Sequence, residues 1–219
     1  MRVKFHLDEI TFSHSLFSQN FIPKLKNHLL SQLLGYEYSG DETEFTSKER
    51  NTATFVNNHI YSHKVLQVNY MTYNMQCKQD SLNLRTHADI MALSQKQKVH
   101  EDRMPEHPYW YTQIIGIFHA QVLHTGPNSH TSEPQHMEFL WVRWLGVDQE
   151  QPSGWHTKHL HWVGFIDGDN KAAFKFLEPE QVICVVHLML AFYCGQGTSN
   201  LKPSIACPLT EKDEDWVYY

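Results

Sequence analysis

The chain has 219 residues, which is enough for one substantial domain or two small ones. Its 18 Lys and Arg residues against 24 Asp and Glu residues give a net charge of −6, so bulk charge does not draw it to nucleic acid. Apolar residues make up 41% and aromatic residues 13% of the chain, which argues against disorder. No apolar run approaches the roughly 18 residues of a membrane-spanning helix, and residues 1–6 lack the apolar stretch of a secretory signal. We therefore expect a folded intracellular protein without a membrane segment.

Residues 20–35 have the pattern of an amphipathic helix of about four turns. Pro23 suits the first turn, where its missing N–H has no partner, and Gly35 ends the helix because it can take a positive φ. We expect the apolar face to pack on the protein's own sheet; a partner-binding face is the alternative. The apolar residues recur at three- and four-residue spacing and are Phe21, Ile22, Leu25, Leu29, Leu30, Leu33 and Leu34.

Beyond a polar turn at residues 39–42, the pattern changes from helical to strand-like. Thr46 and Glu49 have the spacing of a capping box, which predicts a short helix. From about residue 51 the hydrophobic period is two, and the polar, charged residues 94–106 predict a loop. Apolar, aromatic and β-branched runs predict strands at residues 60–61, 66–73, 89–93, 109–122, 137–145, 160–165 and 185–190.

Together these patterns predict a β-rich α+β protein. Residues 1–50 form an N-terminal helical segment, and residues 51–219 form a β-rich, barrel-like domain in one compact unit with it. The strands are expected to make a small β-barrel or a strongly bent antiparallel sheet. Residues 216–219 resemble part of a strand, so we expect a chain truncated at its C-terminus.

The four cysteines are scattered and form no CxxC pair. Such thiols are typical of reduced, mostly buried residues in an intracellular protein. A disulfide between Cys184 and Cys194 remains the alternative, because spacing alone does not decide it. The other two are Cys77 and Cys207.

Three histidines fall within six residues: His156, His159 and His161. Zinc needs three or four converging ligands, and neither HExxH nor a zinc-finger spacing occurs. On a strand, His159 and His161 share one face. The pattern favours a solvated or aromatic-packed histidine face, with weak metal chelation as the alternative. We expect no cofactor.

Motifs for nucleophilic catalysis and phosphate binding do not occur in the sequence. It has no GxSxG elbow, no GxxxxGK[ST] loop and no GxGxxG turn. The carboxylates of residues 41–44 and 211–215 lie in polar stretches that are typical of solvated faces. The sequence therefore predicts that the protein is not an enzyme. A zinc-dependent hydrolase or nuclease that uses the three neighbouring histidines is the least favoured alternative.

Aromatic residues cluster in two of the predicted strands, at residues 108–111 and 141–144. Packing explains most such rings. A minority can line an open cage, because aromatic faces attract quaternary ammonium groups such as methyl-lysine. On a strand, Tyr109 and Tyr111 share one face while Trp110 takes the other, so one set can be core and the other exposed.

The blocks FIPKLKNHLLSQLLGY at residues 21–36 and HPYWYTQIIGIFH at residues 107–119 are the most distinctive of several such stretches. These blocks resemble a protein type that recurs in many copies in mushroom-forming fungi. The likeness covers nearly the whole chain from about residue 20. Such sequences often occur beside, or as the C-terminal part of, transposase-like genes of the Plavaka and KDZ kind, whose catalytic region lies elsewhere, so no catalytic residue carries over. This chain departs from the type at Trp162, where an Arg is usual. The matching blocks include FIPKLKNHLLSQLLGY, IYSHKVLQVNYMTY, HPYWYTQIIGIFH, EFLWVRWLG and GWHTKHLHWVGF.

A second resemblance is to the bromo-adjacent homology domain, a β-barrel of chromatin proteins. The matching elements are residues 89–92, 108–118 and 142–145, although Leu145 replaces the usual aromatic residue. In methyl-lysine-reading members, aromatic residues of the second and third elements help to form the cage. The resemblance implies a cage of Tyr109 and Trp144 with Asp148 or Glu150 as acidic partner, and the candidate ligand-binding residues are Tyr109, Tyr111, Trp144 and Asp148.

The leading hypothesis is a non-catalytic recognition module of a fungal mobile-element protein, associated with chromatin or nucleic acid in the nucleus. Its expected partners are a histone tail or another chromatin protein, or the transposase that it accompanies. The alternative is a structural accessory domain that holds a transposase assembly together through its N-terminal helix. Leu29 and Leu33 lie on the helix face that such an assembly would use.

Overall fold

The computed structural model describes residues 3–6, 21–38, 43–71, 77–84, 88–93, 109–148, 153, 158–168 and 170–194. At residues 3–6, 70, 71, 77, 78 and 193 it describes the backbone alone. In this part of the chain, no helix is both long and apolar enough to cross a membrane.

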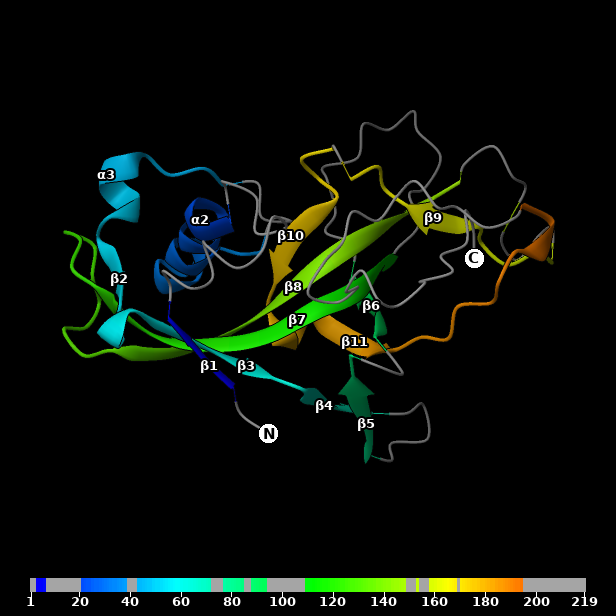
Figure 1. The fold of residues 1–219 in the computed structure, drawn as a ribbon, viewed down its shortest axis with the longest axis horizontal. Coiled ribbons are helices and arrows are strands. Elements are labelled where there is room, and N and C mark those ends of the chain that lie inside the picture. Colours follow the sequence, from blue (N-terminus) through cyan, green and yellow to red (C-terminus); the bar gives the residue numbers. More distant parts are fainter. Residues whose placement is uncertain are drawn as a thin grey trace.

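The centre of the fold is a long antiparallel ribbon of β7 (Tyr109–His124) and β8 (Gln135–Val147) (Figure 1). Both strands are rich in β-branched and aromatic residues, which favour a pleated, half-buried surface. The register shifts between Ile114 and Gly116, so β7 has one more residue than its partner at this point. Both strands were expected from the sequence and are confirmed, each two to four residues longer than expected.

Shorter strands pair along both edges of this ribbon, all of them antiparallel. Along β7 lie β2 (Ala53–Phe55), β3 (His59–His63) and β6 (Asp89–Leu93), followed outward by β1 (Val3–His6) on β3 and β11 (Val182–Val185) on β6. Along β8 lie β9 (Val163–Phe165) and β10 (Phe174–Leu177). A separate hairpin consists of β4 (Val65–Met71) and β5 (Cys77–Asn83).

The β-rich α+β class is confirmed, whereas the closed barrel is wrong. Among the described strands, the path from β1 through β3, β7 and β6 ends at β11, and these two end strands do not pair with each other. The sheet is therefore open. The ribbon extends well beyond each short partner strand, so these partners cover it in separate segments (Figure 1).

Helix α2 (Phe21–Leu33) confirms the amphipathic helix and its packing on the protein's own sheet. Gly35 lies just beyond the helix with a φ of +70°, and the N–H groups of Gly35 and Tyr36 donate to the carbonyl oxygens of Gln32 and Ser31. Each fully buried Leu on its apolar face contributes about 1.5–3 kcal/mol. The buried residues of the helix are Phe21, Leu25, His28, Leu29, Leu30 and Leu33.

Helix α3 (Ser47–Arg50) confirms the expected capping box. The Glu49 N–H donates to the Thr46 hydroxyl oxygen at 3.3 Å, and the Thr46 N–H donates to the Glu49 carboxylate at 2.7 Å. Single 3₁₀ turns complete the described helices: η1 (Val56–Asn58), η2 (Pro179–Gln181) and η3 (Phe192–Cys194).

Two apolar clusters lie on opposite faces of the ribbon, because neighbouring residues of β8 alternate between them. Phe139 and Trp141 pack under α2 with Phe176 of β10. Leu140, Val142 and Trp144 point the other way, toward residues of β4, β5, β6 and β11. Figure 1 shows this arrangement, with α2 on one side of the ribbon and the β4–β5 hairpin on the other.

Candidate functional site

The structure places Trp144 and the two candidate tyrosines on opposite faces of the ribbon. Trp144 lies directly opposite Thr112, whereas Tyr111 lies directly opposite Leu145. Residues that oppose each other in an antiparallel pair share a face, and neighbours along a strand do not. The Trp144 side chain is 7% exposed and packs edge to face against Trp110. It belongs to the core on its face, and it does not meet the tyrosines.

Asp148 follows the end of β8 and is half-buried. Its N–H donates to the carbonyl oxygen of Trp162 at 2.9 Å, which ties this end of β8 to the segment before β9. The structure thus gives the Asp148 backbone a role in the connection between these two strands.

Tyr109 and Tyr111 lie on one face of the sheet together with residues of β6 and β11. Leu93 is opposite Tyr109, Met91 is opposite Tyr111, and Cys184 is opposite Met91. Both tyrosines are half-buried, and Leu93 is 58% exposed. We call this set the tyrosine face: Met91, Leu93, Tyr109, Tyr111 and Cys184.

Burial raises the pKa of the Tyr111 hydroxyl, and Tyr109 and Cys184 raise it further. The two tyrosines and the thiol therefore lie near one another in space. Asp80 lies at the edge of this set, since its carboxylate accepts the Val185 N–H at 3.4 Å. Burial, followed by the charge of Asp80, raises the pKa of the Cys184 thiol, which keeps that thiol protonated at neutral pH.

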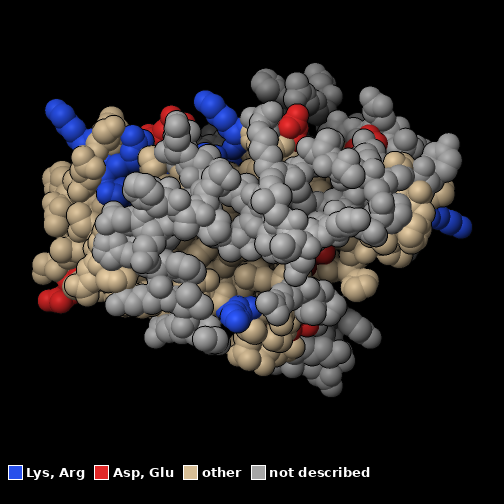
Figure 2. All heavy atoms as spheres, in the orientation of Figure 1, with Lys and Arg blue, Asp and Glu red and all other residues tan. Residues whose placement is uncertain are grey.

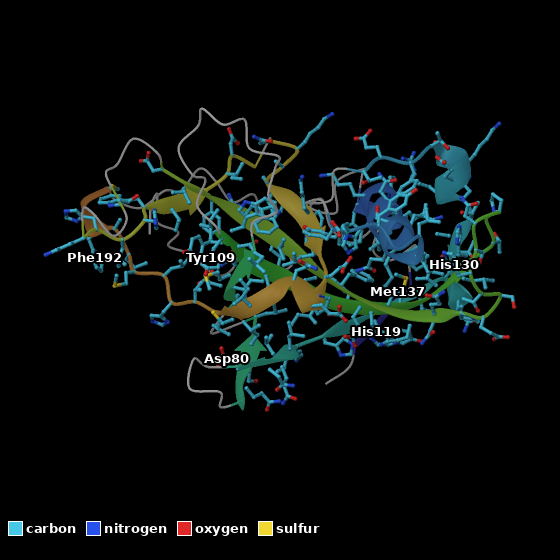
Figure 3. The ribbon with its side chains drawn as sticks, turned by 180° about the vertical axis from the view of Figure 1, so that it is seen from behind. Asp80, Tyr109, His119, His130, Met137 and Phe192 are labelled. Atoms are coloured by element: carbon cyan, nitrogen blue, oxygen red, sulfur yellow. The ribbon has the colours of Figure 1, made fainter. Side chains whose placement is uncertain are left out.

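A second carboxylate, that of Asp89, is on the same side of β6 as Met91 and Leu93. It is half-buried, and its backbone partner across the pair is Gln113. The Asp89 carboxylate of β6 therefore shares the tyrosine face, whereas Asp80 of β5 lies beside the edge strand β11 that carries Cys184. In the view of Figure 3, Asp80 and Tyr109 both lie toward the side of the molecule on which Phe192 is labelled.

Both Cys184 and Cys194 are free thiols, so the alternative disulfide between them is wrong. Each is partly buried, as expected for structural cysteines. Cys207 lies outside the described residues, and Cys77 is described by its backbone alone.

The weak metal candidates from the sequence, His156, His159 and His161, do not form a metal centre in the described part of the chain. His156 lies outside the described residues. His159 is exposed, and the Nδ1 atom of His161 lies 2.9 Å from the Ser153 hydroxyl. Only residues 163–165 of the expected strand form β9, so these histidines precede the strand. No group of three or more His, Cys, Asp or Glu side chains suited to a metal occurs among the described residues.

A different histidine cluster, which sequence reasoning missed, crosses three neighbouring strands. Tyr61 of β3 stacks on His119 of β7 with ring centroids 4.8 Å apart, and His136 of β8 lies on the other side at 4.7 Å. The His63 ring also contacts His119, at 4.8 Å. We call Tyr61, His63, His119 and His136 the histidine ladder.

Exposed polar groups flank the ladder at its β8 end. His136 Nδ1 lies 3.2 Å from the Gln121 amide nitrogen, and its Nε2 lies 3.4 Å from the Glu138 carboxylate. The signal in the sequence was weak but present: His59, Tyr61 and His63 alternate along one strand. The sequence does not reveal the register that brings them against His119.

Arg143 is fully buried. It lies two residues before Leu145 on β8, so it is on the same face of the sheet as the tyrosines. Its guanidinium carbon lies 4.2 Å from the centre of the Phe165 ring and 5.6 Å from that of Phe174. Such cation–π contacts link β8 to β9 and β10. Arg143 is therefore part of the packing that holds this end of the ribbon together.

Comparison with protein-family models, curated proteins and solved structures finds no match.

Proposed function

We propose that this protein is a non-catalytic recognition module that binds a lysine-rich peptide, such as a histone tail, through its tyrosine face. The observation that carries the proposal is the pair of half-buried tyrosines, Tyr109 and Tyr111, which share a sheet face with Asp89 and exposed Leu93, with Asp80 beside the neighbouring edge strand. This set replaces the cage of Tyr109, Trp144 and Asp148 that the resemblance implied.

The chemistry of this face suits an ammonium group. An aromatic ring attracts a cation over its face, and a methylated ammonium gains apolar contact as well. The nearby carboxylates add long-range attraction, and the net charge of −6 favours the approach of a basic segment. Exposed Leu93 offers apolar contact to the rest of the peptide.

The charge distribution favours a basic peptide over nucleic acid as the partner. On the face shown in Figure 2, the Lys and Arg side chains of the described residues gather in a small group over α2 and α3 and otherwise lie apart, so they form no continuous band. Nucleic-acid affinity depends on several basic groups that contact phosphates together. A chromatin peptide therefore fits the coloured surface in Figure 2 better than DNA or RNA does.

A nuclear location, a role beside a fungal transposase and kinship with bromo-adjacent homology domains belong to this proposal. They rest on the sequence resemblances, and the open β-rich sheet agrees with them only at the level of fold class. The accessory role through the N-terminal helix is less favoured. The apolar face of α2 is buried against the sheet, so an assembly would have to use another surface.

The test is binding of the purified chain to lysine-containing peptides of different methylation states, measured on an array and then in solution. Tyr109→Ala and Tyr111→Ala are each expected to weaken binding about tenfold, since one cation–π contact is worth about 0.5–2 kcal/mol. Tyr109→Phe keeps the ring and should keep the affinity. Tyr36→Ala is the matched control, because Tyr36 is 52% exposed and lies just beyond α2. No binding by the folded chain, or equal loss in the Tyr36 variant, would refute the proposal.

A further inference from the structure

Two ring nitrogens of the histidine ladder converge. His63 Nε2 and His119 Nδ1 are 2.5 Å apart. That separation is below the roughly 2.7–3.2 Å of an ordinary N–H···O hydrogen bond. At most one proton fits between the two atoms, so at least one nitrogen presents its lone pair to the other. Imidazole nitrogens are the commonest protein ligands of transition-metal ions, and two of them lie next to each other here.

The strands fix both rings in this arrangement. His119 lies opposite Tyr61, while His63, two residues further along β3, lies opposite Ile117. The two histidines are thus diagonal neighbours on one face of the β3–β7 pair. The planes of the Tyr61 and His119 rings differ by only 9°. The His136 ring of β8 also packs against the His119 ring. These contacts orient the His119 imidazole before any ligand arrives.

Burial gives the pair one protected ligand and one accessible ligand. His119 is 3% exposed, whereas His63 is only partly buried. An ion can therefore approach from the His63 side, while His119 supplies a ring that is already oriented. Figure 3 shows His119 on the ribbon well away from Tyr109, so this pair is separate from the tyrosine face.

We propose that His63 and His119 form a binding site for a divalent transition-metal ion of the Zn²⁺ or Cu²⁺ class. With metal–nitrogen distances of about 2.0–2.1 Å and tetrahedral angles, the two nitrogens would be roughly 3.3 Å apart. Opening the present 2.5 Å separation to that value needs a shift of less than about 1 Å, which side-chain rotation of His63 can supply.

The pair supplies two of the ligands, and among the described residues no group of three or more potential ligands occurs. Imidazole suits Zn²⁺, Cu²⁺ and Ni²⁺ rather than Mg²⁺ or Ca²⁺, and Cu²⁺ should bind most tightly in the usual order of affinities. The ion would replace the shared proton and join β3 to β7. These two strands pair only along Tyr61–His63 of β3. The site would therefore brace the β1–β3 edge of the sheet.

The experiment is a titration of the chelator-treated full chain with Zn²⁺ and, separately, Cu²⁺, followed by calorimetry. Electron paramagnetic resonance of the Cu²⁺ form provides a second readout, because coupling to two imidazole nitrogens identifies the ligands. The chain has 16 histidines, so variants must separate this pair from the others. His63→Gln tests the accessible ligand, and His130→Gln is the matched control at an exposed position in the β7–β8 connection.

We expect the unchanged chain and His130→Gln to bind one ion alike, and His63→Gln to bind it at least tenfold more weakly with loss of the two-nitrogen signal. His119→Gln should have the same effect; if that variant does not fold, the His63 variant decides, because its side chain is only partly buried. Equal binding by folded His63→Gln and His130→Gln would overturn the proposal. No ion binding by the unchanged chain would also overturn it.

Discussion

Trp144 and Trp110 meet edge to face in the core, with ring centroids 5.4 Å apart and ring planes at 75°. Edge-to-face pairs of this kind add about 0.5–1.5 kcal/mol beyond simple burial. The two rings come from β8 and β7, so the contact helps to hold the ribbon together on the face away from α2. Trp144 therefore contributes to the stability of the fold. Substituting Trp144 or the tyrosines separately distinguishes this role from the ligand-binding role proposed for Tyr109 and Tyr111.

Trp144→Ala is expected to lower the free energy of unfolding by about 3–5 kcal/mol, because it leaves a large cavity in a packed core. Urea unfolding followed by circular dichroism measures this loss. The fraction of Trp144→Ala that remains folded should bind peptide as the unchanged chain does. A stable Trp144 variant that has lost peptide binding would instead return Trp144 to the ligand site.

Leu29→Ala should cost about 2–5 kcal/mol of stability, because Leu29 is fully buried between α2 and the sheet. The loss should appear in the unfolding midpoint of the chain on its own, without any partner. Leu160→Ala is the matched control; Leu160 is 67% exposed, and its removal should change stability by less than about 0.5 kcal/mol. If the Leu29 variant is as stable as the control, the helix does not depend on this burial.

The capping box predicts a dependence on pH. Hydrogen bonds from the Thr46 hydroxyl and backbone N–H lower the pKa of the Glu49 carboxyl in the folded chain. A depressed folded-state pKa stabilises the folded form above the unfolded value of about 4.3, and this contribution is lost as pH falls through the folded-state pKa. Glu49→Gln cannot ionise, so its melting temperature should lie below that of the unchanged chain at pH 7. The two values should converge once the pH falls below the folded-state pKa of Glu49, and a difference that stays constant into that range would contradict the prediction.

The Cys184 thiol should react slowly with iodoacetamide. Burial and the charge of Asp80 raise its pKa, so little thiolate is present at pH 8. Peptide mapping by mass spectrometry should show slower labelling of Cys184 in the folded chain than in urea. Asp80→Asn removes the charge but keeps an oxygen that can accept the Val185 N–H, and it should speed the labelling modestly. Labelling of folded Cys184 at the unfolded rate would show that the thiol is not held in this environment.

Features set by neighbours in the sequence were predictable. The period of three to four residues gave α2, and the Thr46–Glu49 spacing gave the capping box of α3. The long apolar runs of β7 and β8 were equally clear. By contrast, β5 and β10 have short or polar sequences, CKQDSLN and FKFL, whose pattern is too brief to distinguish them from loops.

The candidate site was predicted only in part, because it depends on strand register. Tyr109 and Tyr111 were correctly placed on one face, since alternation along a single strand fixes that relation. Whether Trp144 joins them depends on which β7 residue it opposes, and that pairing is not written in either strand alone. The same reason hid the histidine ladder, whose members come from three strands that are far apart in the chain.

The extra residue in β7 between Ile114 and Gly116 determines on which sides of the strand the tyrosine face and the histidine ladder lie. Strict alternation would put the odd-numbered positions Tyr111 and His119 on the same side of the strand. The bulge reverses the phase, so Tyr111 shares the side of Leu145 while His119 shares that of Glu138. A peptide on the tyrosines and an ion on the histidines would then occupy opposite sides of one strand. Neither ligand would block the other.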